Sequence, residues 1–173
     1  MSEFEVICLA NNKDDFNSLI SDIINNKKFN KLDKELHHGI TRYAHSMRVA
    51  KWTYKICKLF NMKNKDNTTR AALLHDFYTD KDLEGNSSVK RLGLHPNMAL
   101  ENSIKYYKLD DIQKDIIETH MFPCNFDIPK YKESWLVSGV DKLVSTYEML
   151  RYKASLYMGI YALFLFEMIK LPR

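Results

Sequence analysis

The spacing of apolar residues along the chain predicts a protein made of helices. Apolar side chains recur every three or four positions through most of the sequence, and no stretch alternates convincingly with the period of two expected for a half-buried strand. The predicted class is therefore all-α, a compact bundle of roughly seven to nine helices. The expected helices run over about 12–24, 29–38, 41–60, 67–77, 96–107, 109–120, 135–152 and 155–169.

Residues 78–94 form the longest polar interruption of this pattern. Pro96 follows as a suitable first residue of the next helix, because a proline there leaves no helical hydrogen bond unmade. The sequence therefore predicts a long loop over 78–94, and long loops in compact domains are often binding loops. This loop would begin directly after His75 and Asp76, which end the apolar run 71–74.

The longest apolar stretch lies near the C-terminus, over residues 155–166. It is shorter than the roughly 20 residues that a membrane-spanning helix needs. We therefore expect a buried terminal helix and no stable membrane insertion. Attachment to a membrane surface and a homodimer interface are the alternatives for this stretch.

Composition limits the protein to a few classes. A chain of 173 residues with 45% hydrophobic content is typical of one domain with a real core, here 1–173. The net charge of +4 suits an anionic small molecule and is too small to indicate a nucleic-acid partner. Three widely spaced cysteines without a CxxC motif, and an N-terminus without signal-peptide features, predict a cytoplasmic protein.

Four histidines and two aspartates could together hold metal ions. They are His45, His75, Asp76, His95, His120 and Asp141. Taken singly, each has a simpler role as a hydrogen-bonded core residue, a loop residue or a solvated charge. Taken together, they supply enough donors for two metal ions, and this mixture of imidazole and carboxylate suits iron, manganese or zinc. The adjacent His37 and His38 could approach the site or simply belong to a loop.

The order and local context of these residues resemble a known family. His45 in TRYAHSMRVA, His75 and Asp76 in AALLHDF, and Asp141 in GVDKL follow the H…HD…D order of the HD-domain metal-dependent phosphohydrolase superfamily. The additional His95 in LHP and His120 in ETH resemble the two-metal subset. That subset includes bacterial symmetrical diadenosine tetraphosphate hydrolases and HD-type cyclic dinucleotide phosphodiesterases. The resemblance covers about 36–150, which would be the core on which the N-terminal helix and the apolar C-terminal helix pack.

The resemblance implies a metal-dependent phosphohydrolase with two divalent metal ions. Iron or manganese would be favoured, with zinc, magnesium or nickel as possible occupants in a crystal. Asp76 would bridge the metals, His45, His75 and Asp141 would hold one of them, and His95 and His120 would complete the second. A hydroxide bridging the metals would then attack a phosphoester or phosphoanhydride of a nucleotide, with a dinucleoside polyphosphate as the favoured substrate.

Cationic side chains are expected to steady the substrate phosphate. Lys142, beside Asp141, and Arg48, one helical turn from His45, are the main candidates, and Arg42 and Arg151 are further ones. Many family members have a lysine three residues after the HD aspartate, where this chain has Thr79. Lys81, Lys90 or Arg91 could take over that contact.

Two other functions remain open at this point. Some HD proteins with this set of ligands hold a diiron centre and oxygenate a substrate. A non-catalytic module that senses a nucleotide is the other alternative. Phosphate release, oxygen consumption, and nucleotide binding without turnover would distinguish the three.

Overall fold

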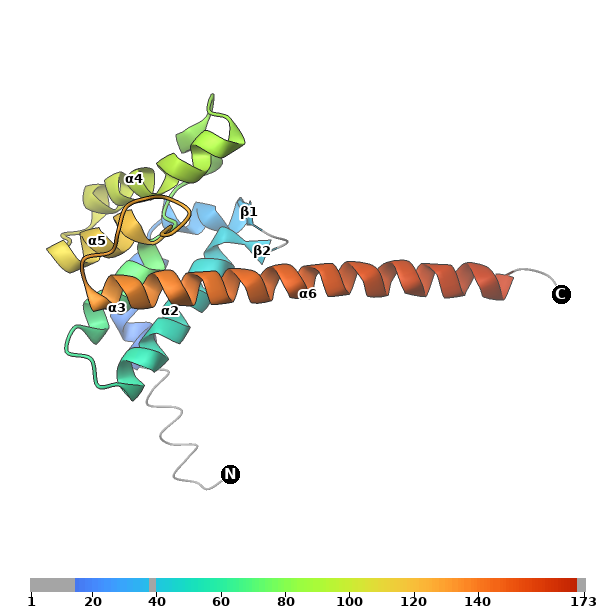
Figure 1. Cartoon of the computed structure of the whole chain (residues 1–173), viewed down its shortest axis with the longest axis horizontal. Helices are drawn as coiled ribbons and strands as arrows, with labels where there is room; N and C mark the ends of the chain where they lie inside the picture. Colours follow the sequence, from blue (N-terminus) through green and yellow to red (C-terminus); the bar gives the residue numbers. More distant parts are fainter. Residues whose placement is uncertain (1–14, 38–39, 171–173) are drawn as a thin grey trace, which may run out of the picture.

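The structure is a computed structural model that describes residues 15–37 and 40–170, and helices make up most of this part of the chain (Figure 1). The all-α prediction is confirmed. Residues 15–24 are helical, and the remaining elements are η1 (Phe29–Lys34), β1 (Leu36–His37), β2 (Ile40–Thr41), α2 (Arg42–Leu59), α3 (Lys65–Leu74), η2 (Asp80–Leu83), α4 (Ser88–Tyr106), α5 (Asp111–Thr119) and α6 (Lys132–Lys170).

A two-residue antiparallel ladder joins β1 and β2, with Leu36 opposite Thr41. We predicted a helix over 29–38 here, and that prediction is wrong at its C-terminal end, because the 3-10 helix stops at Lys34 and the chain then becomes extended. His38 lies outside the described residues, as does the start of the predicted 12–24 helix. Helix α2 begins at Arg42, directly after the second strand of this ladder.

Helix α2 begins where the sequence predicts. Thr41 is extended and its side-chain oxygen accepts a hydrogen bond from the backbone N–H of Ala44 at 3.2 Å, which caps the helix. The buried residues recur every three or four positions along α2, so one face of the helix packs into the core. They are Arg42, His45, Ser46, Val49, Ala50, Thr53, Tyr54 and Cys57. This face packs against α3 and α6.

Helix α3 carries the apolar run into the core. It begins at Lys65, two to three residues before the predicted cap at Asn67 or Thr68. Its last turn, 71–74, is fully buried, and the helix ends with His75 as its C-cap. The apolar run therefore places His75 and the next residue at the edge of the core.

Helix α4 begins at Ser88, so the predicted loop over 78–94 is about half as long as expected. Pro96 lies inside this helix and not at its first turn, which corrects the sequence prediction. The proline ring fits helical backbone angles and costs one backbone hydrogen bond, and the surrounding turns of the 19-residue helix continue past it. The remaining connection holds η2, which Thr79 caps by donating its N–H to Asp82 Oδ2 at 2.7 Å.

Helix α6 is one continuous helix of 39 residues, whereas we predicted two helices that meet near residue 154. No proline lies between 150 and 156, so the backbone has no reason to break there. The N-terminal half packs against α2, α3 and α5, and the rest extends away from the domain (Figure 1). We call residues 151–170 the projecting half of α6.

The projecting half contradicts the prediction of a buried terminal helix packed on the core. Every residue from 151 to 161 is exposed. Apolar periodicity predicts that a helix needs a partner, but it does not say that the partner is the same chain. Large apolar side chains are exposed along it, namely Leu156, Tyr157, Met158, Ile160, Tyr161, Leu163 and Phe166. None of the described helices is long and apolar enough to cross a membrane.

We predict that a chain ended at Ser155 folds with nearly unchanged stability. The deleted residues are exposed from 156 to 161, so their removal takes no buried surface from the core there. The unfolding midpoint should therefore shift by less than about 3 °C, which is roughly 1 kcal/mol for a chain of this size. Thermal unfolding followed by circular dichroism would measure this shift. A large fall in the midpoint would mean that the projecting half stabilises the folded domain.

Candidate metal centre

The fold brings all six predicted donor residues together in one buried cluster. Three helices and two helix ends supply them: His45 comes from α2, His95 from α4 and Asp141 from α6, whereas His75 and Asp76 come from the end of α3 and His120 from the end of α5. Each of the six is at most 7% exposed. Residues up to 96 positions apart in the sequence therefore share one site.

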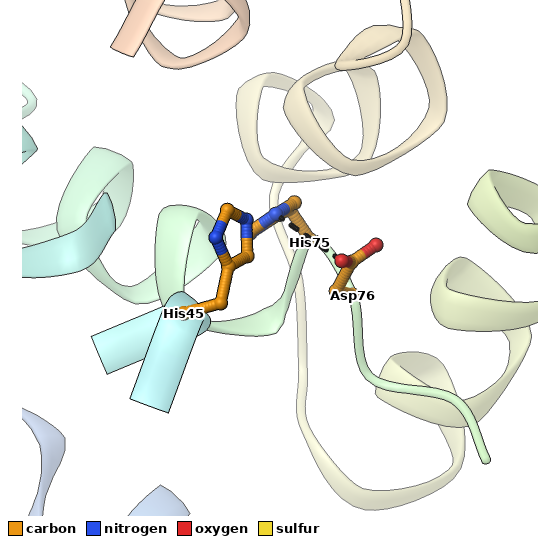
Figure 2. Close-up of side chains that lie close together, drawn as sticks. All are labelled: His45, His75 and Asp76. Carbon is orange, nitrogen blue, oxygen red and sulfur yellow. Dashed lines mark ion pairs between the residues drawn. The ribbon is translucent and has the colours of Figure 1, made fainter. Parts of the chain in front are cut away.

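Two groups within this cluster have the spacing of metal ligands. The first contains His45, His75 and Asp76, and the second contains Asp76, His95 and His120, with donor atoms within 4.8 Å of one another in each group. Figure 2 shows the first group, with the His45 ring from α2 beside the His75 ring and Asp76 next to it. Asp76 belongs to both groups, the position expected of a bridging carboxylate.

Asp141 completes the first group. Its Oδ1 atom lies 3.0 Å from His45 Nε2 and 3.6 Å from His75 Nε2. The His75 Nε2 atom also lies 3.7 Å from Asp76 Oδ2. The Nε2 atoms of this group therefore lie 3.0 to 3.7 Å from carboxylate oxygens of Asp76 and Asp141, so one metal ion could be bound by all of these atoms.

The histidine rings of the cluster are held by their Nδ1 atoms. His75 Nδ1 lies 2.7 Å from the carbonyl oxygen of Ala72, and His120 Nδ1 lies 2.8 Å from that of Ile117. A carbonyl oxygen only accepts hydrogen bonds, so each Nδ1 must carry the proton. A ring protonated at Nδ1 alone has its lone pair at Nε2, directed into the cluster, as metal ligation requires.

The second group shows most clearly that a cation fits. His95 Nδ1 lies 3.2 Å from the carbonyl oxygen of Arg91, so it too carries the proton. The Nε2 atoms of His95 and His120 lie 3.1 Å apart and would face each other lone pair to lone pair. Asp76 Oδ1 lies 3.5 Å from His95 Nε2 and 3.6 Å from His120 Nε2. A metal ion among these three atoms would satisfy all of them.

Two atoms of the cluster are buried without a hydrogen-bond partner among the described residues. They are His75 Nε2, which belongs to the first group, and Asp76 Oδ1, which faces the histidines of the second group. Buried polar atoms in folded proteins are rarely left unsatisfied. Both atoms are metal donors and both face the cluster, so the residues present fit two divalent cations.

The pKa shifts of His95, His120 and Asp76 favour the protonation states that bind a metal ion. Burial lowers the pKa of His120 to about 3, helped by the nearby His75 and His95 rings, and burial also lowers the pKa of His95. Both rings are therefore neutral near pH 7 and able to ligate. Burial alone would raise the pKa of Asp76, but the surrounding imidazoles outweigh it and lower that pKa, so the carboxylate is ionised.

His45 differs from His95 and His120. Burial acts to lower its pKa, but hydrogen bonds to Asp141 and Glu148 outweigh burial and raise the pKa to about 10. In the metal-free protein this ring therefore carries a second proton near pH 7. A metal ion at its Nε2 atom would replace that proton.

A cavity of about 400 Å³ opens onto the cluster. Asp76, His95, His120 and Asp141 reach its wall, as do three cationic side chains, Arg42, Arg91 and Lys142. Anionic and imidazole donors thus lie at the inner wall with cations beside them. The size is within the range of small-molecule sites.

Each of the three cations is held in place by neighbouring groups. The Arg42 guanidinium lies 4.0 Å above the ring of Tyr78, and Arg91 Nε donates to the carbonyl oxygen of Asn86 at 3.0 Å. The Lys142 ammonium lies 3.3 Å from Asp141 Oδ2 and donates to the carbonyl oxygen of His120. Lys142 therefore lies at the cavity, where the sequence analysis expected a substrate contact.

Arg48 does not line this cavity, which corrects its predicted position. Its guanidinium pairs with the buried carboxylate of Glu148, and Arg48 lines a separate apolar hollow with Trp52 and Tyr147. The spacing of three residues does place Arg48 on the same side of α2 as His45. However, Glu148 from α6 binds the guanidinium, on the side of His45 that faces away from the other donors.

Glu148 is the residue that the sequence analysis missed. It lies seven positions after Asp141, which is two turns of the same helix, so both carboxylates face the same side of α6. An acidic residue at this spacing from a candidate ligand, among apolar neighbours, was the available signal. The other displaced candidates are Arg151, which is exposed on α6, and Lys81 and Lys90, which do not line the cavity.

Comparison with known families gives one result. The family described as HD domain matches residues 42–145, more than half of the chain. The matched segment contains all six donor residues and ends before Glu148. No curated protein and no solved structure gives a significant match.

We predict that metal ions stabilise the protein increasingly as the pH rises. The raised pKa of His45 contributes stability to the metal-free protein below about pH 6.5, and this contribution is lost as the pH rises toward about 10. Metal binding needs the deprotonated ring and is therefore favoured by the same rise in pH. The gap in unfolding midpoint between protein with Mn²⁺ and protein with a chelator should widen from about pH 6.5 to about pH 8.5.

A His45→Gln variant is the control for this measurement, because it removes the titrating ring. Its midpoint gap should be smaller and should change less with pH. A gap that stays constant with pH in the unmodified protein would contradict the assignment of a proton to the His45 site.

Proposed function

Because the chain belongs to the HD domain family and keeps its buried His/Asp clusters intact, we propose that this metal-dependent phosphohydrolase cleaves a phosphoanhydride or phosphoester bond of a nucleotide. A dinucleoside polyphosphate is the favoured substrate. The observation that carries the proposal is the position of Asp76. It is shared by two groups of metal donors and reaches the wall of a cavity that three cationic side chains also line.

The donor residues divide between two metal sites in this proposal. His45, His75 and Asp141 would hold one ion, His95 and His120 would hold the other, and Asp76 would be a ligand of both. Two bound divalent ions would supply an activated water as the nucleophile and neutralise charge on the phosphate. The fully buried end of α3 anchors the backbone before Asp76, so the carboxylate that the two donor groups share is held in place.

The cations of the cavity have a separate role, which is to bind and orient the phosphate chain. Lys142 contacts the donor residue Asp141, and Arg42 and Arg91 come from other elements around the cavity. Three cations on three helices suit several linked phosphates better than a single phosphate. This arrangement is the reason for favouring a polyphosphate over a monoester.

We predict that Asp76→Ala abolishes phosphate-bond hydrolysis and the binding of both metals. Removal of the shared carboxylate takes a ligand from each site, so turnover should fall at least about 100-fold. Metal content by mass spectrometry and phosphate or nucleotide release with Mn²⁺ or Fe²⁺ are the measurements. The substrates would include dinucleoside tetraphosphates, cyclic dinucleotides and mononucleotides.

Asp111→Ala is the matched control, since Asp111 is an exposed carboxylate whose side chain is 85% accessible. It should retain full activity. Turnover retained by Asp76→Ala would contradict a metal-dependent hydrolase. Oxygen consumption by the metal-loaded protein without phosphate release would instead support the diiron oxygenase.

We predict that His95→Ala and His120→Ala each bind about one metal ion per chain. Each change removes a nitrogen donor from the second group and leaves the first group complete. Titration with Mn²⁺ or Co²⁺ would give the stoichiometry. If either variant still bound two ions with unchanged affinity, the assignment of these residues to the second site would be wrong.

A further inference from the structure

We propose that Glu148 is a positioning residue that orients His45 and strengthens it as a metal ligand. The inference rests on the metal sites of the proposed function. Glu148 lies beyond the segment that matches the HD domain family. Its evidence is a set of contacts on the side of the His45 ring that faces away from the other donors.

Both oxygens of the Glu148 carboxylate are occupied. Oε2 lies 2.8 Å from His45 Nδ1, and Oε1 accepts a hydrogen bond from the Arg48 guanidinium. The Glu148 side chain is 1% exposed, as is that of His45. A carboxylate with a separate partner on each oxygen and no access to water has one orientation, so it fixes the plane of the ring that it contacts.

The His45 ring is held at both ends by one helix. Its Nδ1 atom faces Glu148, and its Nε2 atom faces Asp141 Oδ1 at 3.0 Å. The two carboxylates are two turns apart on α6, whereas His45 comes from α2. The packing of α6 against α2 therefore sets the direction of the Nε2 lone pair.

The other three histidines are held differently. Each directs Nδ1 at a neutral carbonyl oxygen three or four residues earlier in its own chain segment. Among the described residues of the cluster, His45 alone has a carboxylate at Nδ1. An anionic acceptor makes the imidazole a stronger electron donor at Nε2 than a carbonyl oxygen does. Glu148 should thus raise the affinity of the His45 site in particular.

Arg48 acts on the same carboxylate and not on substrate. Its guanidinium balances the charge of Glu148 and holds the oxygen that His45 does not use. Removal of Arg48 should therefore weaken the effect of Glu148 without eliminating it. This role explains an arginine one turn from a metal ligand that does not reach the cavity.

The test is the metal affinity of each site in Glu148→Ala and Glu148→Gln. Competition with a chelator would give the affinity for Co²⁺, and its visible absorption would report the ligand field at each site. Glu148→Ala should weaken one of the two sites by about 10-fold to 100-fold and leave the other nearly unchanged. Glu148→Gln keeps an acceptor oxygen without the charge, and Arg48→Met keeps the carboxylate without its partner, so both should lose less.

Glu133→Gln is the matched control. Glu133 is a buried carboxylate on the same helix, and it accepts a hydrogen bond from Asn64 at 3.1 Å, away from the donor cluster. This variant should bind both ions as the unmodified protein does. If Glu133→Gln weakened binding as much as Glu148→Gln, the effect would reflect general destabilisation and the inference would be overturned.

Two further outcomes separate this inference from the proposed function. A folded Glu148→Gln or Glu148→Ala protein with unchanged Co²⁺ affinity and spectrum at both sites would overturn the positioning role, even if the protein hydrolyses nucleotides. Conversely, an unmodified protein that binds two ions but releases no phosphate from any substrate would overturn the proposed function. The positioning role would then still stand if Glu148→Ala lost affinity at one site.

Discussion

The burial of one ionised carboxylate among four imidazoles is the interaction on which this structure depends. Taking a carboxylate out of water costs several kcal/mol unless nearby groups compensate for it. Asp76 is 5% exposed, and the rings of His45, His75, His95 and His120 lower its pKa despite that burial. The helices that carry these rings must therefore meet around one residue.

The helix ends make this meeting point possible. His75 is the C-cap of α3 and His120 is the C-cap of α5, where the helix dipole favours a cation, such as a metal ion, beside the neutral rings. The apolar turns before them fill the core, with Leu73, Ile116 and Ile117 fully buried. The same segments thus stabilise the fold through their apolar residues and present donors at the point where the core ends.

Much of this arrangement could be predicted from the sequence. The helical class follows from apolar spacing, the start of α2 from Thr41, and the six donors from a distinctive order of histidines and aspartates. Helical spacing and the Thr41 cap depend on residues that are neighbours in the sequence. The donor set depends on a fixed order of residue types, which can be recognised without knowing how the segments pack.

Other features depend on packing between distant segments. Pro96 indicates a helix start, yet neighbouring turns carry α4 through it. Arg48 has the right spacing for a substrate contact, but only the fold shows that Glu148, 100 residues later, binds its guanidinium. Apolar spacing over 155–169 predicts a helix without specifying what covers it. Each case needs the position of a second element, which a single sequence does not supply.

The course of α6 connects the metal site to a remote part of the molecule. Asp141 and Glu148 lie on the last packed turns of this helix, and the projecting half continues for roughly 30 Å at 1.5 Å per residue. A continuous helix transmits a tilt along its length, so a binding partner that tilted the projecting half would rotate both carboxylates relative to His45 on α2. By thermodynamic reciprocity, metal binding would in turn change the preferred orientation of the projecting half.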